Sequence, residues 1–295
     1  MGEESDDWFK KNNALWISLF LLPSLMGFLV FIIYPVFYSL GVSFTDWDLI
    51  NPMKFVGIKN YQSLVNDSTF WNSLKNTFLF IIGYLPSVMI IGLLVALLLN
   101  SKLCLKPVFR GVYFLPVVTS WVAVSLVWKW LFNPKYGLIN YFLTMIGLHG
   151  PNWLNDPKTA MLAIIITSVW KDIGFIMVLY LGGLQNISVS LYEAADIDGA
   201  DKWHQFWKIT LPMLKQTTFF VSMISLINSF QVFDQVNIMT AGGPGDATTV
   251  LVQNIYNSAF KYSEMGYAAA MSWILFLIIL VVSVVQMWGE RKLTK

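Results

Sequence analysis

The chain has 295 residues, of which 56% are hydrophobic and only 12% are charged, and its formal net charge is +2. Soluble domains carry about 25% charged residues, so this composition indicates a protein that crosses a membrane several times and excludes a typical nucleic-acid-binding protein. The single cysteine, Cys104, excludes an internal disulfide. His149 and His204, the two histidines, lie far apart in the sequence, and no metal site is predicted.

Six long apolar runs follow one another along the chain, and a membrane-spanning helix needs about 20 such residues. Acidic residues precede the lysines before the first run, and no small-residue cleavage site follows it, so we interpret it as a retained helix and not a removed signal peptide. We therefore predict an all-α polytopic membrane protein with six transmembrane helices. The predicted spans are residues 14–34, 77–99, 111–128, 159–184, 216–233 and 265–288.

Lysine and arginine are unequally divided between the two predicted sides of the membrane. The side that holds both termini has eleven basic residues and the other side has six. Because basic residues concentrate in cytoplasmic segments, both termini are predicted to be cytoplasmic. The inner residues are Lys10, Lys11, Lys102, Lys106, Arg110, Lys202, Lys208, Lys215, Arg291, Lys292 and Lys295, and the outer ones are Lys54, Lys59, Lys75, Lys135, Lys158 and Lys261.

A polar stretch, residues 190–212, separates the fourth and fifth spans on the predicted cytoplasmic side. Ser190 and Glu193 have the spacing of a capping box, which predicts a helix that begins directly after Ser190. Gly199 is predicted to end this helix in a left-handed conformation, and Asp201 to cap a second short helix. The second helix would carry Trp203, Phe206 and Trp207, with Pro212 ending it or beginning the next one.

The same stretch resembles the "EAA" signature of the permease subunits of binding-protein-dependent ABC importers. In that family the signature forms a cytoplasmic coupling helix that docks in a cleft of the ATPase subunit, and the resemblance implies this role here. The alternative is an ordinary loop with two amphipathic turns. The residues implied in ATPase coupling are Glu193, Ala194, Ala195, Asp198, Gly199, Ala200, Ile209, Leu211 and Pro212.

Other stretches, among them FLPVVTSWVAVSLVWKWLF, WKDIGF and FQVFDQVNIMTAGGP, are similar to the carbohydrate-type branch of the family, the maltose- or glycerol-phosphate-type permeases. The resemblance implies a type I permease core of five helices at residues 71–288, with the coupling helix at 190–212. Residues 1–70 would supply a cytoplasmic N-terminus, one additional helix and an outer segment. Residues 289–295 would form a cytoplasmic tail.

The resemblance also implies partners and a location. The partners would be a second, homologous permease subunit, two ATPase subunits, an extracytoplasmic solute-binding protein, a sugar substrate and membrane lipid, in a bacterial or archaeal cytoplasmic membrane. The sequence itself contains no G-x-x-x-x-G-K-[ST], H-E-x-x-H or G-x-S-x-G motif. We therefore predict no enzyme site and no cofactor in this chain, with ATP and Mg²⁺ bound by the partner ATPase subunits.

Lys171 and Asp172 lie near the middle of the fourth predicted span. A charge at that depth costs about 2.5 to 3.5 kcal/mol on insertion scales, so both side chains are expected to face protein or a wet cavity. They could line a translocation path, or they could belong to a structural break beside Gly174. Lys171 would favour an acidic sugar, whereas Asp172 would cancel its charge locally, so the charge of the sugar stays open.

In the fifth predicted span, Ser225, Asn228 and Ser229 share one helical face. Sugar-importing relatives contact the sugar from the fourth and fifth spans, and aromatic rings, amides and hydroxyls suit a sugar. Each of these residues could instead hold neighbouring helices together. The substrate path implied by the resemblance comprises Trp170, Lys171, Asp172, Phe175, Ser225, Asn228, Ser229 and Val232.

Two other classes of function compete with an ABC importer. An ion-coupled secondary transporter is the main alternative, although the spans show no detectable internal repeat. A membrane-embedded enzyme or scaffold is the third, with no catalytic constellation in its favour.

Overall fold

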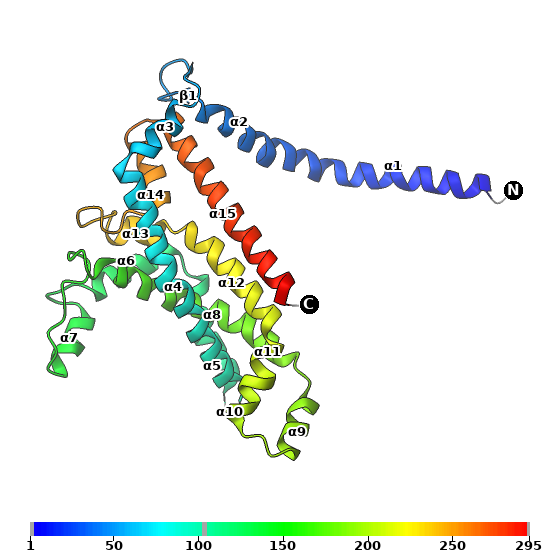
Figure 1. Cartoon of the computed structure of the whole chain (residues 1–295), viewed down its shortest axis with the longest axis vertical. Helices are drawn as coiled ribbons and strands as arrows, with labels where there is room; N and C mark the ends of the chain where they lie inside the picture. Colours follow the sequence, from blue (N-terminus) through cyan, green and yellow to red (C-terminus); the bar gives the residue numbers. More distant parts are fainter. Residues whose placement is uncertain (1–2, 102–104, 294–295) are drawn as a thin grey trace. The chain divides into compact units, whose positions relative to one another are not determined.

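The computed structural model describes the backbone of residues 3–101 and 105–293 and the side chains of residues 16–101 and 105–290 (Figure 1). Residues 1, 2, 294 and 295, together with Lys102 of the predicted basic loop and Cys104, lie outside the described residues. The regular secondary structure of the described chain is helical apart from one pair of two-residue strands, which confirms the predicted all-α class. It divides into two compact units, residues 1–66 with 257–274 and residues 67–256 with 275–295.

The first unit contains the N-terminal helices and an outer segment. The helical backbone continues without a gap from α1 through a π-helical turn into α2, whose second residue is Pro35. Gly266 lies so close to Thr45 that a Cβ atom at Gly266 would be 1.8 Å from the Thr45 carbonyl oxygen. The elements are α1 (Glu3–Phe28), the π-helical turn η1 (Leu29–Ile33), α2 (Tyr34–Ser43), β1 (Thr45–Asp46) antiparallel to β2 (Lys54–Phe55), α3 (Lys59–Asn66), η3 (Asn257–Lys261) and the start of α15 (Met265–Leu293).

The second unit holds the remaining helices. Asp67 begins it as the N-cap of α4, where its carboxylate accepts a hydrogen bond of 2.8 Å from the Thr69 backbone N–H. The elements are α4 (Ser68–Asn100), α5 (Lys106–Val118), α6 (Trp121–Leu131), α7 (Leu138–Met145), α8 (Ala160–Gln185), α9 (Val189–Ile197), α10 (Lys202–Gln205), η2 (Phe206–Thr210), α11 (Leu211–Met213), α12 (Lys215–Phe230), α13 (Asp234–Met239), α14 (Leu251–Tyr256) and the rest of α15.

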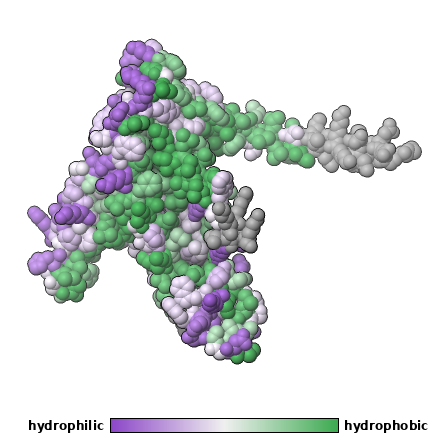
Figure 2. All heavy atoms as spheres, viewed as in Figure 1, coloured by the Kyte–Doolittle hydropathy of each residue, from purple (hydrophilic) through white to green (hydrophobic). Residues whose placement is uncertain are grey.

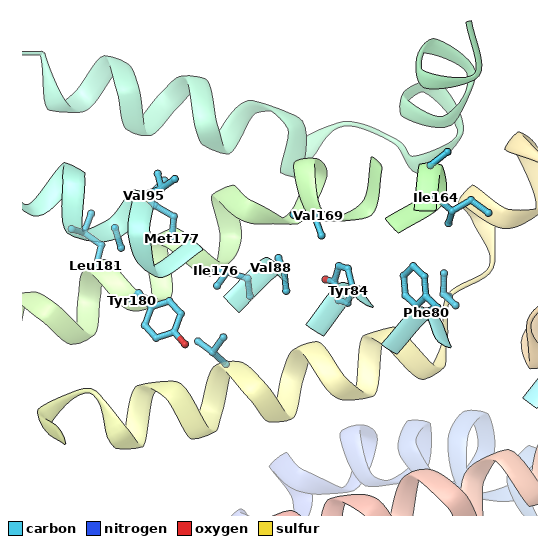
Figure 3. Packing of buried hydrophobic residues seen from close by; sticks show 14 of the residues in the cluster. Phe80, Tyr84, Val88, Val95, Ile164, Val169, Ile176, Met177, Tyr180 and Leu181 are labelled. Atoms are coloured by element: carbon cyan, nitrogen blue, oxygen red, sulfur yellow. The ribbon is translucent and has the colours of Figure 1, made fainter. Parts of the chain in front are cut away.

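The core of this unit is the contact between α4 and α8 (Figure 3). Gly92 allows the two helices to approach closely, because a Cβ atom there would lie 2.5 Å from a methyl carbon of Ile176. Close packing of small and large side chains is what holds helices together in lipid. The buried residues labelled in the figure are Phe80, Tyr84, Val88 and Val95 of α4, with Ile164, Val169, Ile176, Met177, Tyr180 and Leu181 of α8.

Membrane spans are recognised by helix length and apolar composition. Among the described residues, four helices meet both criteria, and α5 with α6, bent by 100° between them, would make a fifth. The fifth predicted span, residues 216–233, is interrupted: α12 has only 16 residues and ends at Phe230. A span of about 20 residues is the usual requirement, so α12 alone is short. The four helices are Trp16–Ser43, Ser68–Asn100, Ala160–Gln185 and Met265–Glu290.

Candidate functional site

The first candidate site is the coupling segment, which we define as α9 to α11, residues 189–213. The predicted capping box at its start is wrong. Helix α9 begins at Val189, with Ser188 as its N-cap, and the hydroxyl oxygens of Ser188 and Ser190 lie 2.7 Å apart. Ser188 gives the helix an earlier start than Ser190 would, which places Glu193 in the fifth helical position, beyond the third position that a capping box requires.

The end of α9 agrees with the sequence prediction. Gly199 has a φ of +77°, which is the left-handed conformation that glycine adopts without steric cost. Its backbone N–H donates to Asp196 O at 3.2 Å, and the Ala200 N–H donates to Ala195 O at 2.9 Å. These two bonds form a Schellman motif, which turns the chain sharply after the helix.

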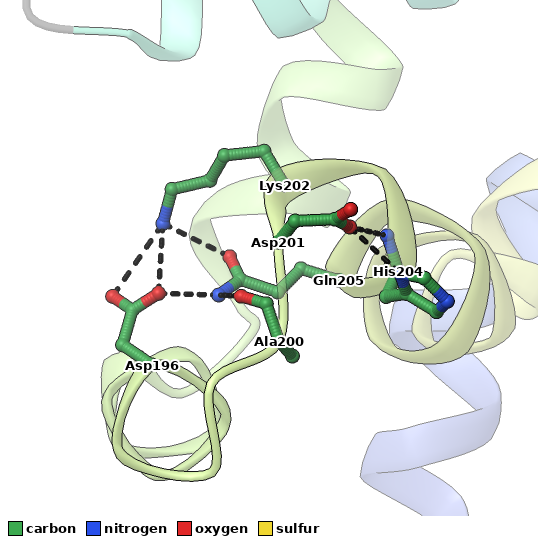
Figure 4. A network of polar contacts seen from close by, with 6 residues as sticks. All are labelled: Asp196, Ala200, Asp201, Lys202, His204 and Gln205. Carbon is green, nitrogen blue, oxygen red and sulfur yellow. Dashed lines mark hydrogen bonds and ion pairs between the residues drawn. The ribbon is translucent and has the colours of Figure 1, made fainter.

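A polar network then fixes α10 beside the end of α9 (Figure 4). The Lys202 ammonium lies 3.0 Å from Asp196 Oδ1 and 3.1 Å from Gln205 Oε1. The buried Gln205 amide donates to Asp196 Oδ1 and, at 3.1 Å, to Ala200 O. The hydrogen bonds from Lys202 and then Gln205 lower the pKa of the exposed Asp196 carboxyl below its usual value. The network therefore defines how α10 follows α9.

Asp201 caps the second short helix, as predicted. Its Oδ1 accepts a hydrogen bond of 2.7 Å from the His204 backbone N–H, and this bond is the main reason that the pKa of Asp201 is lowered. The following turns carry the expected aromatic residues, whose rings contact one another. They are Trp203, Phe206 and Trp207.

The predicted coupling residues are partly brought together. A shallow cavity of about 390 Å³ lies between the two arms of the coupling segment, and Glu193, Ala194, Leu211 and Pro212 lie outside it. Polar and apolar residues are mixed on this tip of the molecule, at the bottom of Figure 2. Ile197, which sequence reasoning did not select, is 87% exposed there. The cavity is lined by Ala195, Asp198, Gly199, Ala200, His204, Gln205, Lys208 and Ile209.

The second candidate site, the central cavity, has a volume of about 470 Å³ and is formed within the second unit. It contains aromatic rings, amides, hydroxyls and two carboxylates. The rings of Phe80 and Tyr84 are stacked with centroids 5.2 Å apart, so they give the α4 wall a flat aromatic surface. The lining residues are Phe80, Tyr84, Trp121, Ser168, Asp172, Asn228, Ser229, Gln231, Val232, Phe233, Asp234 and Gln235.

An interruption of the fifth predicted span shapes this cavity. After α12 ends at Phe230, the backbone leaves the helical conformation and Phe233 has φ −147° and ψ −60° before α13 begins. Irregular backbone at membrane depth is tolerated where it lines a cavity or is buried in protein. The interruption brings Gln231 and Asp234 to the wall together, and Gln235 donates to Ser168 Oγ at 3.1 Å, which ties α13 to α8.

Lys171 and Asp172 have different surroundings, although they are adjacent. The Tyr84 hydroxyl donates to Asp172 Oδ2 at 2.7 Å, and Asp172 lines the central cavity. Lys171 does not line the cavity, and only 4% of its surface is exposed. Its ammonium donates to the backbone oxygens of Pro116 and Val117, each at 3.1 Å, and lies 4.8 Å from the centre of the Trp121 ring. Both oxygens belong to the last turn of α5, where the Pro116 oxygen also accepts a hydrogen bond of 3.2 Å from the Thr119 backbone N–H.

Some of the other predicted path residues line the central cavity and some do not. Asn228, Ser229 and Val232 line the central cavity. Ser225 is buried outside it, Phe175 packs against the core, and the exposed Trp170 ring lies 5.4 Å from that of Trp128. Ser168, which also lines the cavity, lies four residues before Asp172 on the same helical face, so the spacing alone could have predicted it as a path residue. Tyr84 and Trp121 also line the cavity, but they come from apolar spans in which no spacing of polar residues points to them.

Comparison with known proteins agrees with this architecture. The family described as "Binding-protein-dependent transport system inner membrane component" matches residues 88–295. The chain is 40% identical over 280 residues to the probable ABC transporter permease protein YurN of Bacillus subtilis, covering 93% of this chain and 96% of YurN. It is 38% identical over 281 residues to the lactose transport system permease protein LacF of Rhizobium radiobacter, covering 93% of each chain.

A solved structure has the same fold. It is a chain of a bacterial ABC transporter involved in the import of the acidic polysaccharide alginate, with a TM-score of 0.85, 24% identity and coverage of 98% of this chain and 99% of that one. The relatives are permease proteins and not enzymes, in agreement with the sequence prediction. The chain therefore belongs to the family of binding-protein-dependent transport system inner membrane components, the permease subunits of ABC transporters.

Proposed function

We propose that this chain is a transmembrane permease subunit of an ATP-driven, binding-protein-dependent sugar importer, and that it forms half of the translocation path. The observation that carries the proposal is the composition of the central cavity. Aromatic faces from Phe80, Tyr84 and Trp121 suit the apolar faces of sugar rings, and the amides of Asn228 and Gln235 suit sugar hydroxyls. The lactose permease protein LacF, similar over nearly its whole length, supports a sugar substrate.

The proposed path differs from the one implied by the sequence. Asp172, Asn228, Ser229 and Val232 remain in it, because they line the central cavity. We propose structural roles outside the path for the four residues that do not line the cavity, which are Trp170, Lys171, Phe175 and Ser225. The break between α5 and α6 and the break after α12 both adjoin the cavity, so these two positions are proposed to move when the path opens.

The coupling segment is proposed to dock on an ATPase subunit. The geometry of the segment itself supports this proposal. Gly199 and the network around Gln205 hold α9 and α10 in one arrangement. The exposed Ile197 offers an apolar contact to a partner. Glu193 and Ala194 are exposed on the same helix and are available to a partner. A rigid element of this kind can transmit a movement of the ATPase to the membrane helices.

The remaining partners belong to the same proposal. A second, homologous permease subunit would complete the path, two ATPase subunits would bind ATP and Mg²⁺, and an extracytoplasmic solute-binding protein would deliver the sugar. The excess of basic residues on the side of the coupling segment supports cytoplasmic termini in a bacterial or archaeal membrane. The permease core would occupy residues 71–288, preceded by one additional helix.

Two measurements test the proposal together. A tagged chain, purified from its native membrane, should carry with it a different permease and an ATPase. Uptake of a panel of labelled neutral and acidic sugars should disappear in cells that lack the gene and return when the gene is restored. Uptake that survives ATP depletion but stops when the ion gradient is dissipated would establish the ion-coupled alternative.

A further inference from the structure

The charge of the central cavity gives information about the sugar. Two of its lining residues, Asp172 and Asp234, are acidic, and no basic side chain of the described chain lines it. A cavity with charges of one sign between low-dielectric walls repels ligands of that sign more strongly than an open surface does. The family relationship does not determine this charge, since it follows from the residues that face the cavity.

We infer that this wall of the path selects sugars without anionic groups and rejects sugars that carry a carboxylate or a sulfonate. The inference rests on the proposed function, because it assumes that the central cavity is where the sugar passes. It also settles the question that Lys171 and Asp172 raised in the sequence. The basic member of the pair does not line the cavity, whereas the acidic member does.

The position of Asp172 explains how its carboxylate recognises a neutral sugar. The Tyr84 hydroxyl donates to Oδ2 at 2.7 Å and fixes the orientation of the carboxylate. Among the described residues no hydrogen bond to Oδ1 is found, so this oxygen can accept one from a sugar hydroxyl. A carboxylate is an acceptor only, so it matches hydroxyl donors and cannot bond to a second carboxylate. The exposed Asp234, at the start of α13, extends the same preference along the wall.

Lys171, which is adjacent to Asp172 in the sequence, cannot reverse this preference by direct contact. The Lys171 ammonium is engaged by the oxygens of Pro116 and Val117 and by the Trp121 ring. The remaining polar lining side chains are those of Tyr84, Trp121, Ser168, Asn228, Ser229, Gln231 and Gln235, and none of them is basic. An anionic sugar would therefore meet two carboxylates on this wall without a compensating ammonium or guanidinium group.

The charge of the wall can be measured directly with a cysteine probe. The chain has one cysteine, so Cys104→Ser with Asn228→Cys leaves a single thiol, placed in the cavity wall. The purified complex is treated with cationic trimethylammonioethyl methanethiosulfonate or anionic sulfonatoethyl methanethiosulfonate, and mass spectrometry follows the peptide that contains residue 228. We expect the ratio of the cationic to the anionic rate to exceed that of free glutathione about tenfold.

Variants identify the source of this ratio. In the same background, Asp172→Asn with Asp234→Asn should bring the ratio close to that of glutathione. Asp234→Asn alone leaves the Tyr84 to Asp172 hydrogen bond intact, so it should lower the ratio partly even if the double variant folds poorly. Asp156→Asn, in an outer segment, is the matched control and should leave the ratio unchanged. A ratio equal to that of glutathione in the parent, or one unaffected by either cavity variant, would overturn the inference.

A transport measurement separates this inference from the proposed function. Complexes are reconstituted with the solute-binding protein and supplied with labelled galactobiose or with digalacturonate, which carries carboxylates in place of primary alcohols. Uptake of digalacturonate by the parent complex would overturn the charge preference and leave the importer function intact. Absence of an ATPase from the purified complex would overturn the proposed function, while the thiol measurement would still report the charge of the wall.

Discussion

The ammonium of Lys171 lies 3.1 Å from the backbone oxygen of Pro116, across the contact between α8 and α5. A second contact adjoins it: a Cβ atom on Gly174 would lie 2.0 Å from the Tyr113 carbonyl oxygen. One face of α8 therefore holds the end of α5 by a bridging cation and by close backbone packing. The bend of 100° between α5 and α6 begins directly after this point.

Replacing Lys171 with methionine should destabilise the protein. The change removes two charge-assisted hydrogen bonds, each worth about 1.5 to 3 kcal/mol, and leaves the Pro116 oxygen with its bonds from Thr119 alone. We expect the melting temperature of the purified complex to fall by roughly 5 °C. The measurement is the loss of the folded complex in size-exclusion chromatography after heating.

Lys129→Met provides the matched control for this prediction. Lys129 also donates to a backbone oxygen, that of Ile238 at 3.1 Å, but it is exposed. Water can replace that bond, so the control should melt close to the parent. Equal melting of Lys171→Met and the parent, together with altered sugar selectivity, would return Lys171 to the translocation path.

Gly199→Val should uncouple the permease from its ATPase. Valine resists the left-handed φ of +77°, which costs about 1 to 2 kcal/mol and displaces the start of α10. Less ATPase should copurify and uptake should fall, while the amount of permease in the membrane stays similar. Gly147→Val is the control, because Gly147 has a φ of +79° but lies far from the coupling segment in the sequence. Equal ATPase recovery from the two variants would contradict the prediction.

Glu193→Ala should weaken ATPase binding with little effect on folding. Glu193 is exposed and takes no part in a capping box, so its replacement should change the unfolding free energy by no more than about 0.5 kcal/mol. Glu193→Gln keeps the shape of the side chain and removes its charge. If the glutamine variant binds the ATPase as tightly as the parent does, hydrogen bonding and not charge pairing accounts for the contact.

The network at Asp196 should resist mild acidification. Its hydrogen bonds from Lys202 and Gln205 lower the pKa of Asp196 in the folded state relative to the unfolded state. Stability from this group is therefore present above the unfolded pKa and is lost as the pH falls through the lower, folded value. The protection factors of the Gly199 and Ala200 amides against hydrogen exchange, each taken relative to the unprotected rate at the same pH, should hold at pH 5 and fall only below about pH 4.

Asp196→Asn tests the cause of that behaviour. The variant loses the ion pair with Lys202, so the protection factors of both amides should be lower at pH 7 and should change little on acidification. An unchanged pH dependence in the variant would show that another group controls the segment.

Local signals in the sequence were sufficient for part of both sites. Gly199 and Asp201 were predicted correctly because a left-handed stop and an N-cap depend on a few neighbouring residues. Ser188 was missed as the N-cap because Ser190 offers the same chemistry two residues later. The helical spacing of Ser225, Asn228 and Ser229 predicted a shared face; Asn228 and Ser229 line the central cavity, whereas Ser225 is buried outside it.

The remaining features depend on contacts between distant segments. The partners of Lys171 are backbone oxygens, and such atoms have no signature in a sequence. Tyr84 comes from a span that is apolar throughout, so only the fold reveals that its hydroxyl reaches Asp172. The end of α12 at Phe230 was missed because an apolar run does not show where a helix stops within it.

Within about two turns, α8 presents two faces with separate tasks. Positions 168 and 172 face the central cavity, whereas positions 171 and 174 hold α5. In the proposed path, exchanges at the first pair would alter the wall that meets the cargo, whereas exchanges at the second pair would disturb the contact with α5 whatever the cargo is. A lineage carrying this helix could thus change its cargo at one face of α8 and leave the face that holds α5 as it is.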